Sequence, residues 1–182
     1  MSQKRFNYQL VITLAKKENH ARELARILNS NQTTLVRKLN ELRSENIVDF
    51  KKEEKNKVFF LKKTLEARQA FCASELILLS EFIKKNPLLR SVVEQIQKNK
   101  RVELAVLFGS YAKDLSTVTS DIDVYLCTTY HPLKETIEKI DSKLSVKIGQ
   151  YNRNSVLMRE IEKNHLIIKG VELFYEKSKL ST

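Results

Sequence analysis

Apolar residues recur at helical spacing through about the first 45 residues of the chain, which predicts three short helices. The first two stripes comprise Phe6, Leu10, Val11 and Leu14, then Leu24, Ile27 and Leu28. Ser30 and Asn31 interrupt this pattern, and both residue types favour helix N-caps. A third helix follows at once. Its apolar face is expected to comprise Leu35, Val36, Leu39 and Leu42.

Strand-like alternation replaces the helical pattern after about residue 47. Val48 and Phe50 alternate with polar residues, the segment KEEKNK supplies a polar turn, and the apolar run VFFL at 58–61 returns as a second strand. The sequence therefore predicts a lysine-rich β-hairpin directly after the three helices.

One longer helix is expected between residues 64 and 86. Thr64 is placed to cap its start, and Pro87 ends it and begins the next helix as its first residue. Its apolar side chains cover more than one face and comprise Phe71, Leu76, Ile77, Leu78, Leu79, Phe82 and Ile83. Packing within the chain and pairing with a second copy of the chain both account for this surplus, and the sequence leaves the choice open.

A chain of 182 residues is long enough for one large domain or two small ones, and we expect two. The low counts of 3 Gly and 2 Pro leave little room for unstructured linkers. No apolar run reaches the ~20 residues of a membrane span, and the sequence has no signal-peptide pattern at its start. We therefore expect a cytoplasmic protein with no membrane partner. Cys72 and Cys127 are isolated, which fits a reducing compartment, and the 3 His are too scattered for a zinc site.

The positive charge, +11 in total, lies mainly in residues 1–64, which carry 15 basic and 7 acidic side chains. Residues 101–182 carry 12 and 11. Three helices, a hairpin and this charge resemble a winged helix-turn-helix domain over residues 5–63, including its ELARILN…TTLVRKLNELRSENIV cadence. The resemblance implies binding of double-stranded DNA, or alternatively a protein-interaction module. The expected DNA contacts are Gln32, Thr33, Thr34, Arg37, Lys38, Lys55 and Lys57.

A second set of chemistry-bearing residues lies in LFGSYAKDLSTVTSDIDVYL, residues 107–126. A buried strand is expected to end at Gly109, where the missing Cβ lets the backbone approach a phosphate, and Ser110 adds a hydroxyl. Asp121 and Asp123 are two residues apart on the next strand, so alternation directs both carboxylates to one face. Two such carboxylates repel each other unless a cation lies between them, and Mg²⁺ accepts carboxylates together with phosphate oxygens.

The order Gly-Ser, ten residues, then Asp-x-Asp resembles the signature of the DNA polymerase β-like nucleotidyltransferases, most closely their minimal branch. The similarity covers about residues 87–176 and includes the segments SDIDVYL, SVKIGQY and IIKGVELFYE. It implies that Gly109 and Ser110 hold the phosphates of a nucleoside triphosphate. It also implies that Asp121 and Asp123 are catalytic and bind the Mg²⁺ that orients attack on the α-phosphate.

Two positions depart from that pattern. Asp114 stands where many members have glycine. Lys147 falls on the next long strand, where catalytic members usually supply a third carboxylate. A lysine there could pair with the two aspartates in place of a cation, which would impair metal-dependent transfer.

The sequence thus predicts an α+β protein. It has a winged helix-turn-helix domain at 1–64, a connector and possible dimerisation helix at 65–86, and a nucleotidyltransferase-like mixed sheet flanked by helices at 87–182. The leading interpretation is a homodimeric DNA-binding transcriptional regulator whose C-terminal domain binds a nucleotide and is degenerate as an enzyme. Two alternatives stay open. One is an active Mg-dependent transferase acting on a protein or small molecule, and the other is an interaction protein that binds a helical toxin-like partner.

Overall fold

The computed structural model describes residues 3–54, 56–113, 115, 117 and 119–178, with side chains from residue 7 onward. Lys55, Asp114 and the side chain of Phe6 therefore lie outside the described part. The chain divides into two compact units, Met1–Ile77 and Leu78–Thr182. In the part of the chain that is described, no helix is both long and apolar enough to cross a membrane.

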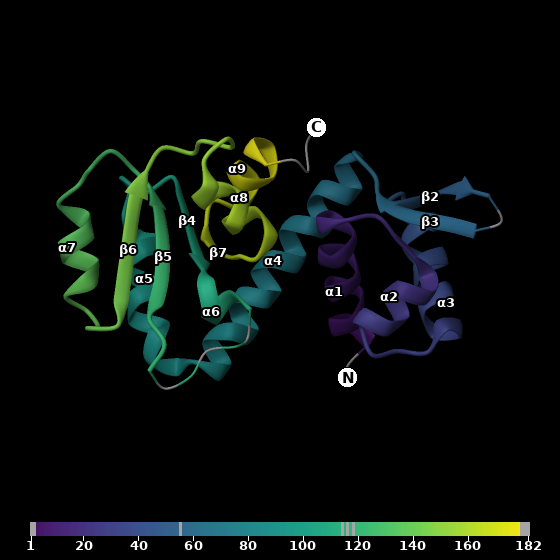
Figure 1. Ribbon diagram of the computed structural model, residues 1–182, viewed down its shortest axis with the longest axis horizontal. Coiled ribbons are helices and arrows are strands. Elements are labelled where there is room, and N and C mark those ends of the chain that lie inside the picture. The colour runs from purple at the N-terminus through teal and green to yellow at the C-terminus, as the bar shows by residue number, and fades with distance from the viewer. Residues whose placement is uncertain (1–2, 55, 114, 116, 118, 179–182) are drawn as a thin grey trace. The chain divides into compact units, whose positions relative to one another are not determined.

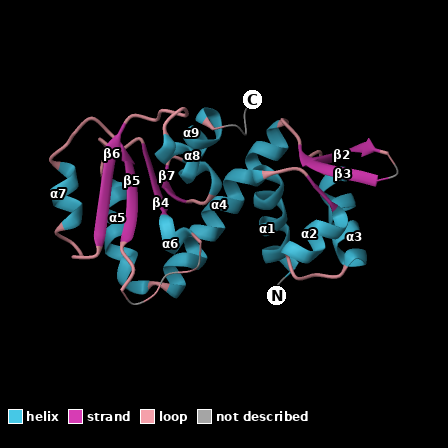
Figure 2. Cartoon of the chain, viewed as in Figure 1, coloured by secondary structure: helices cyan, strands magenta, loops and turns pink. Residues whose placement is uncertain are grey.

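The first unit contains three helices, a three-stranded antiparallel sheet and the beginning of a long fourth helix (Figures 1 and 2). The elements are α1 (Gln3–Lys16), β1 (Asn19–His20), α2 (Ala21–Ile27), α3 (Gln32–Ser44), β2 (Val48–Glu53), β3 (Asn56–Leu61) and α4 (Leu65–Lys85). Strands β2 and β3 form the predicted hairpin, with Phe50 opposite Phe59. Strand β1 pairs with the other edge of β3 and was not predicted.

Two predicted helix caps are present in the first unit. The side-chain oxygen of Asn31 accepts the backbone N–H of Thr34 at 2.7 Å, at the start of α3. The Thr64 hydroxyl accepts the N–H of Ala67 at 3.3 Å, at the start of α4. Each cap satisfies a backbone donor that the first turn of a helix leaves unpaired, and this fixes where α3 and α4 begin.

The predicted apolar face of α3 is wrong at one position. Leu35, Leu39 and Leu42 are buried as expected, but Val36 is 36% exposed and Lys38 is only 6% exposed. Steps of three, four and seven residues from Leu35 reach Lys38, Leu39 and Leu42, so these four residues share a stripe. Val36 is turned about 100° away from Leu35. The aliphatic stem of Lys38 therefore completes the buried face of the helix.

Helix α4 contributes side chains to both units. Phe71 and Cys72 are buried and belong to the first unit, whereas Leu79 is part of the buried core of the second unit. Leu78, Phe82 and Ile83 pack against that same core. Packing within the chain thus covers most of the apolar surplus of this helix. Among its described side chains, the large apolar ones left exposed are Leu65 and Leu76.

The second unit is a four-stranded mixed sheet, in the order β6-β5-β4-β7, with flanking helices. Its elements are η1 (Pro87–Leu89), α5 (Arg90–Lys98), β4 (Leu104–Phe108), α6 (Gly109–Ala112), β5 (Ile122–Cys127), α7 (Leu133–Glu138), β6 (Leu144–Gly149), α8 (Val156–Lys163), β7 (Leu166–Lys169) and α9 (Val171–Lys177). Strand β4 is antiparallel to β5 and β7, and β5 is parallel to β6. Pro87 begins the 3-10 turn that leads into α5, as predicted.

Alternation along β5 and β6 determines what each face of this sheet carries. Ile122, Val124 and Leu126 of β5 share one core with residues of α5 and α7. The residues between them point to the other face. In register across the parallel pair, Asp123 lies beside Ser145 and Tyr125 beside Lys147. The same strands therefore hold a hydrophobic core on one side and a set of polar side chains on the other.

Candidate functional site

Gly109 and Asp123, distant in sequence, lie against each other at one end of the sheet. Strand β4 ends at Phe108, which is directly opposite Asp123 in the antiparallel pair. Gly109 follows with φ of +71°, and a Cβ built on it would collide with the carboxylate oxygen Oδ2 of Asp123. Glycine is needed here because the backbone is left-handed and because the carboxylate fills the space that a side chain would take.

The two aspartates influence each other. Burial raises the pKa of Asp123 above its usual value, and the nearby carboxylate of Asp121 raises this pKa further. Asp121 itself lies just before β5 and is exposed. A partly buried carboxylate beside a second one is unfavourable for the fold alone, and such arrangements concentrate at binding and catalytic sites.

Lys147 lies on the same face of the sheet as Asp123. Its charge lowers the pKa of Asp123, as does a hydrogen bond between Asp123 and Ser145, but both effects are smaller than those that raise this pKa. Sequence reasoning identified Lys147 and missed Ser145. The signal was available, because Ser145 is two residues before Lys147 on the same strand and therefore on the same face.

Ser110 follows Gly109 in the short helix α6. Its carbonyl oxygen accepts the N–H groups of Lys113 and Leu115, at 3.2 and 3.1 Å, which starts the loop toward Asp121. The Ser110 hydroxyl forms no hydrogen bond with any other described residue and is only partly buried. It is therefore accessible to a ligand that approaches this end of the sheet.

A metal at this end of the sheet would have few protein ligands. No group of three His, Cys, Asp or Glu residues suited to a metal occurs in the described ranges. Asp121 and Asp123 provide two carboxylates, and the neighbouring strand provides Lys147 in place of a third. Mg²⁺ tolerates one or two protein carboxylates when phosphate and water oxygens complete its shell. The donor set therefore fits a Mg²⁺ ion that arrives with a polyphosphate, and it does not fit a site built from protein alone.

The predicted contact residues on α3 differ in accessibility. Gln32, Thr33 and Arg37 are exposed, and Thr34 is half-buried. Arg37 and the nearly buried Lys38 both pair with the Glu41 carboxylate, at 2.6 and 2.7 Å. The expectation that Lys38 faces outward beside Arg37 is therefore wrong, because the Lys38 ammonium is held against its own helix.

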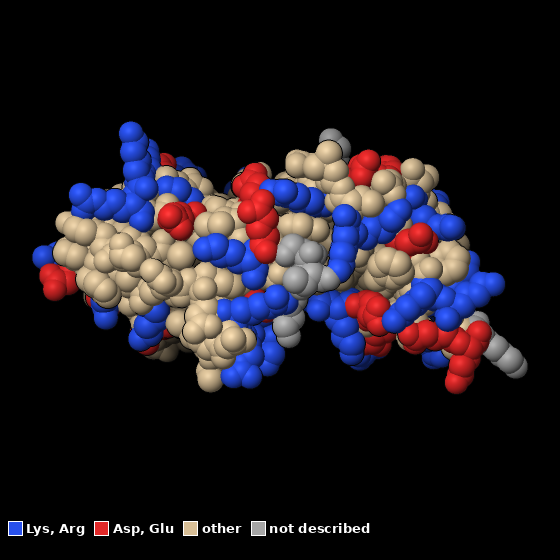
Figure 3. All heavy atoms as spheres, turned by 90° about the horizontal axis from the view of Figure 1, so that it is seen from above, with Lys and Arg blue, Asp and Glu red and all other residues tan. Residues whose placement is uncertain are grey.

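The hairpin lysines also have neighbours of their own. Lys57 is exposed and its ammonium lies 4.2 Å from the centre of the Phe50 ring. Lys51 pairs with Glu18 and Glu53 at 2.7 and 3.1 Å. On the face shown in Figure 3, Lys and Arg are interspersed with Asp and Glu. Lys51 and Lys57 are thus each held by neighbours within the first unit.

Comparison with known families identifies the second unit. Residues 90–178, just under half of the chain, match the family described as Polymerase beta, Nucleotidyltransferase. The chain contains a nucleotidyltransferase-like domain. The matched residues include Gly109, Ser110, Asp121, Asp123 and Lys147, so the polar end of the sheet lies within this domain. A comparison with curated proteins found no match for the chain.

Proposed function

We propose that the chain is a DNA-binding transcriptional regulator whose nucleotidyltransferase-like domain binds a nucleoside triphosphate with Mg²⁺ and is a poor transferase. The proposal that the chain binds a nucleotide depends on one observation. The backbone of Gly109 lies close to the carboxylate of Asp123, which has Asp121 nearby. This juxtaposition places the partly buried Asp123 near a second carboxylate, and both burial and that carboxylate raise the pKa of Asp123.

Each residue of this site has a distinct function in the proposal. Gly109 approaches the phosphates through its backbone, and Ser110 through its hydroxyl. Asp121 and Asp123 supply carboxylate ligands for the metal, and the bound Mg²⁺ would neutralise the phosphates and position them. Ser145 orients Asp123 by its hydrogen bond.

Lys147 is the reason for proposing weak transfer. It offers a positive charge on the face where a third carboxylate would act as metal ligand or base. An ammonium attracts phosphate oxygens, so binding of a nucleotide is retained, but it repels a metal and accepts no proton from an attacking hydroxyl at neutral pH. Binding and chemistry are therefore expected to separate in this domain.

The DNA half rests on the first unit. We propose that the first unit is a winged helix-turn-helix domain, and the succession of α1, α2, α3, a β-hairpin and a further short strand supports this. In such domains the start of the helix equivalent to α3 enters the major groove. Gln32, Thr33 and Arg37 are exposed at or near that start. We propose that these residues contact bases and that Lys57 contacts phosphate. Lys38 is left to hold Glu41. A homodimer, which would match the symmetry of paired half-sites, is part of the same proposal.

Calorimetry and a transfer assay test the nucleotide half together. Nucleoside triphosphates are titrated into the full chain with and without Mg²⁺, and transfer of labelled nucleotide is followed in parallel. We expect Mg²⁺-dependent binding that falls about tenfold or more in Asp123→Ala, with slow or absent transfer. Binding that is absent, or unchanged in Asp123→Ala, would contradict the nucleotide site.

An efficient transferase is the second candidate function, and the two neighbouring carboxylates favour it. Rapid transfer by the unmodified protein, abolished in Asp121→Ala, would establish this alternative and refute the proposed poor activity. The assay therefore distinguishes the two functions without knowledge of the natural acceptor, provided that transfer to water or to the protein itself is also measured.

Gel shifts with a pool of duplexes at increasing salt test the DNA half. We expect binding that weakens steeply with salt, because cations of the first unit displace counterions from DNA. Arg37→Ala should weaken binding by about tenfold or more, whereas Lys57→Ala should mainly reduce the salt dependence. Lys139→Ala, an exposed position in the second unit, is the control. Absence of salt-dependent duplex binding would refute the DNA assignment.

A further inference from the structure

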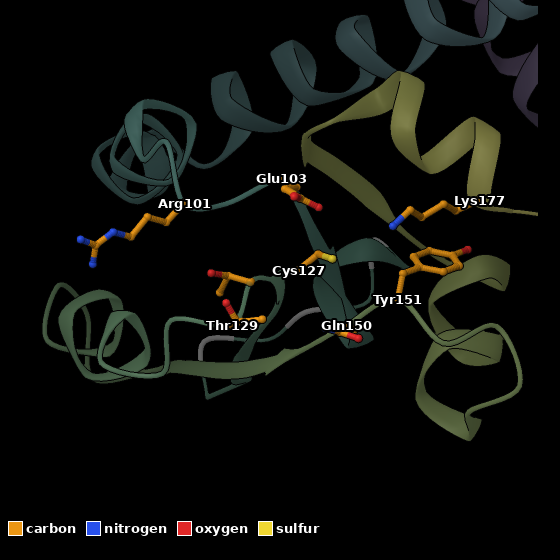
Figure 4. Close-up of a pocket in the computed structure, with 8 residues that line it drawn as sticks. Arg101, Glu103, Cys127, Thr129, Gln150, Tyr151 and Lys177 are labelled. Carbon is orange, nitrogen blue, oxygen red and sulfur yellow. The ribbon is translucent and has the colours of Figure 1, made fainter.

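A polar pocket of about 380 Å³ lies at the end of the sheet opposite to Gly109 and Asp123. Its residues come from the approach to β4 and from the segments that follow β5 and β6, together with the end of α9 (Figure 4). The site with the aspartates lies where β4 ends and β5 begins, so the two sites are at opposite ends of the same strands.

The strand geometry separates the pocket from the candidate nucleotide site. Cys127, which lines the pocket, is four residues beyond Asp123 on β5. At the rise of an extended strand this is about 13 Å. A small ligand in the pocket is thus too far away to attack a phosphate that is held beside Asp123. Any ligand of the pocket would therefore bind apart from the candidate nucleotide site.

Two side chains of opposite charge face each other across the pocket. Glu103 and Lys177 both point into the space above Cys127 (Figure 4). Both are exposed, and neither forms an ion pair with any residue that the structure describes. The two charges are therefore available to a ligand.

The other residues that line the pocket limit which groups can contact a ligand. The Arg101 guanidinium stacks on the Tyr130 ring at 4.0 Å and extends away from the pocket (Figure 4). The Tyr151 hydroxyl donates to Glu162 at 2.7 Å and is already used. Thr129 and Gln150 leave a hydroxyl and an amide at the rim. The groups free to recognise a ligand are therefore one carboxylate, one ammonium and two neutral polar groups.

We propose that this pocket binds a small dipolar ligand that carries both an ammonium and a carboxylate, of the amino-acid class. Glu103 accepts hydrogen bonds from the ligand ammonium and Lys177 donates to its carboxylate, as charge-assisted bonds. The volume is at the lower end of small-molecule sites, which suits a ligand of this size. Because the two groups bind opposite ends of the ligand, a molecule with only one of the charges should bind poorly.

Isothermal calorimetry of the full chain with glycine, L-serine, L-glutamine and L-phenylalanine tests the proposal. At least one is expected to bind, and acetate and methylammonium should each bind about tenfold more weakly or worse. Glu103→Gln and Lys177→Met should each reduce amino-acid binding by about tenfold or more. The matched controls Glu172→Gln and Lys139→Met, at exposed positions outside the pocket, should not reduce it.

The outcomes are decisive in both directions. No binding by any of the four amino acids, or binding that persists in both pocket variants, overturns the proposal. If acetate and the amino acids bind equally well, the hypothesis of a dipolar ligand is wrong, because that result indicates a simple anion site at Lys177. Retention of amino-acid binding in Asp123→Ala, which disables the proposed nucleotide site, is expected and shows that the two sites are separate.

Discussion

Glu41 in the first unit and Asp123 in the second are both acidic side chains with a lysine nearby, but their surroundings act in opposite directions. A hydrogen bond from Lys38, together with the charges of Lys38 and Arg37, lowers the pKa of Glu41. Burial and the carboxylate of Asp121 raise the pKa of Asp123, despite Lys147. Glu41 is therefore stabilised as an anion by the fold, and Asp123 is not.

This difference separates charges that serve the fold from charges kept for a ligand. The first unit has the larger net charge, yet several of its cations are paired locally, among them Arg26, Arg37, Lys38, Arg43 and Lys51. Residues 101–182 are nearly neutral in total, with 12 basic and 11 acidic side chains, yet they include an acidic pair that the fold does not satisfy. Local repulsion between carboxylates is therefore a more informative signal of a site in this protein than net charge.

Gly109→Ala is expected to have the largest effect on stability, because it changes the residue that lies against the carboxylate of Asp123. A left-handed backbone with a Cβ, and a collision with Asp123, should lower the free energy of unfolding by about 1–3 kcal/mol and displace the carboxylate. Gly149→Ala is the control, because its added Cβ would make only ordinary contacts with the Tyr125 ring. Thermal unfolding of both variants measures the difference, and equal stabilities would show that Gly109 is not constrained.

Substitution of Lys147 sharpens the comparison, since it changes the sign of the charge beside the acidic pair. Lys147→Asp supplies a third carboxylate and should strengthen Mg²⁺ binding by about tenfold, because a metal ligand replaces a repelling cation. Lys147→Gln removes the cation without adding a ligand, so it should strengthen binding less. Calorimetry with Mg²⁺ in the presence of a nucleotide tests the order. Unchanged Mg²⁺ binding in both variants would show that Lys147 does not act on the aspartates.

Asparagine substitutions should change stability in opposite directions in the two units. The pKa of Asp123 is raised in the folded state, so its ionisation costs stability as the pH rises through and above the usual value of 3.8. Asp123→Asn should therefore be more stable than the unmodified protein at pH 7, by about 1 kcal/mol or less, and this gain should vanish at pH 3.

Asp49 is the opposing case in the first unit. The Phe50 N–H and then Arg43 lower its pKa, so Asp49→Asn should reduce stability at pH 7, and the loss should diminish as the pH falls below 3.8. Denaturant unfolding at pH 3, 5 and 7 measures both variants. The same sign for both at pH 7 would break the contrast between the units.

The smallest expected effect on stability belongs to Leu76→Glu. Leu76 is 57% exposed, so this change should alter the free energy of unfolding by no more than about 0.5 kcal/mol. If the chain forms the proposed homodimer through the exposed side of α4, light scattering should nevertheless show a shift toward monomer. A protein that is monomeric before substitution, at all concentrations, would rule out that dimer. Leu78 is unsuitable for this test because it packs against the core of the second unit.

Much of the fold followed from the sequence because the periodicities of two and of about 3.6 are strong. Alternation in β5 alone predicts that Ile122 and Val124 face a core and that Asp123 faces away from it. The Gly109 position was also predictable, since a glycine at the end of a buried strand implies a special backbone. The structure adds a reason that the motif does not contain, which is the carboxylate of Asp123 filling the space of the missing side chain.

The misses have physical causes. Lys38 was predicted to contact DNA, although its position on the stripe of Leu35 required burial of its stem. Strand β1 consists of only Asn19 and His20 and exists because it pairs with β3. The local sequence therefore has no alternation of apolar and polar residues that could predict it. The pocket brings Glu103, Cys127 and Lys177 together through the sheet topology, and residues so distant in sequence carry no local signal of their proximity.

Helix α4 has a consequence for how this protein can be divided or recombined. The charge pattern suggests a boundary near residue 64, and Pro87 suggests another. A gene fragment that ends at the first boundary would omit Phe71 and Cys72 from the first unit, and one that begins at the second would omit Leu79 from the other. Neither unit is thus a free module. If one unit is replaced by a foreign domain, the unit that is kept must retain the whole of α4, or the foreign domain must supply the part of the helix that is lost.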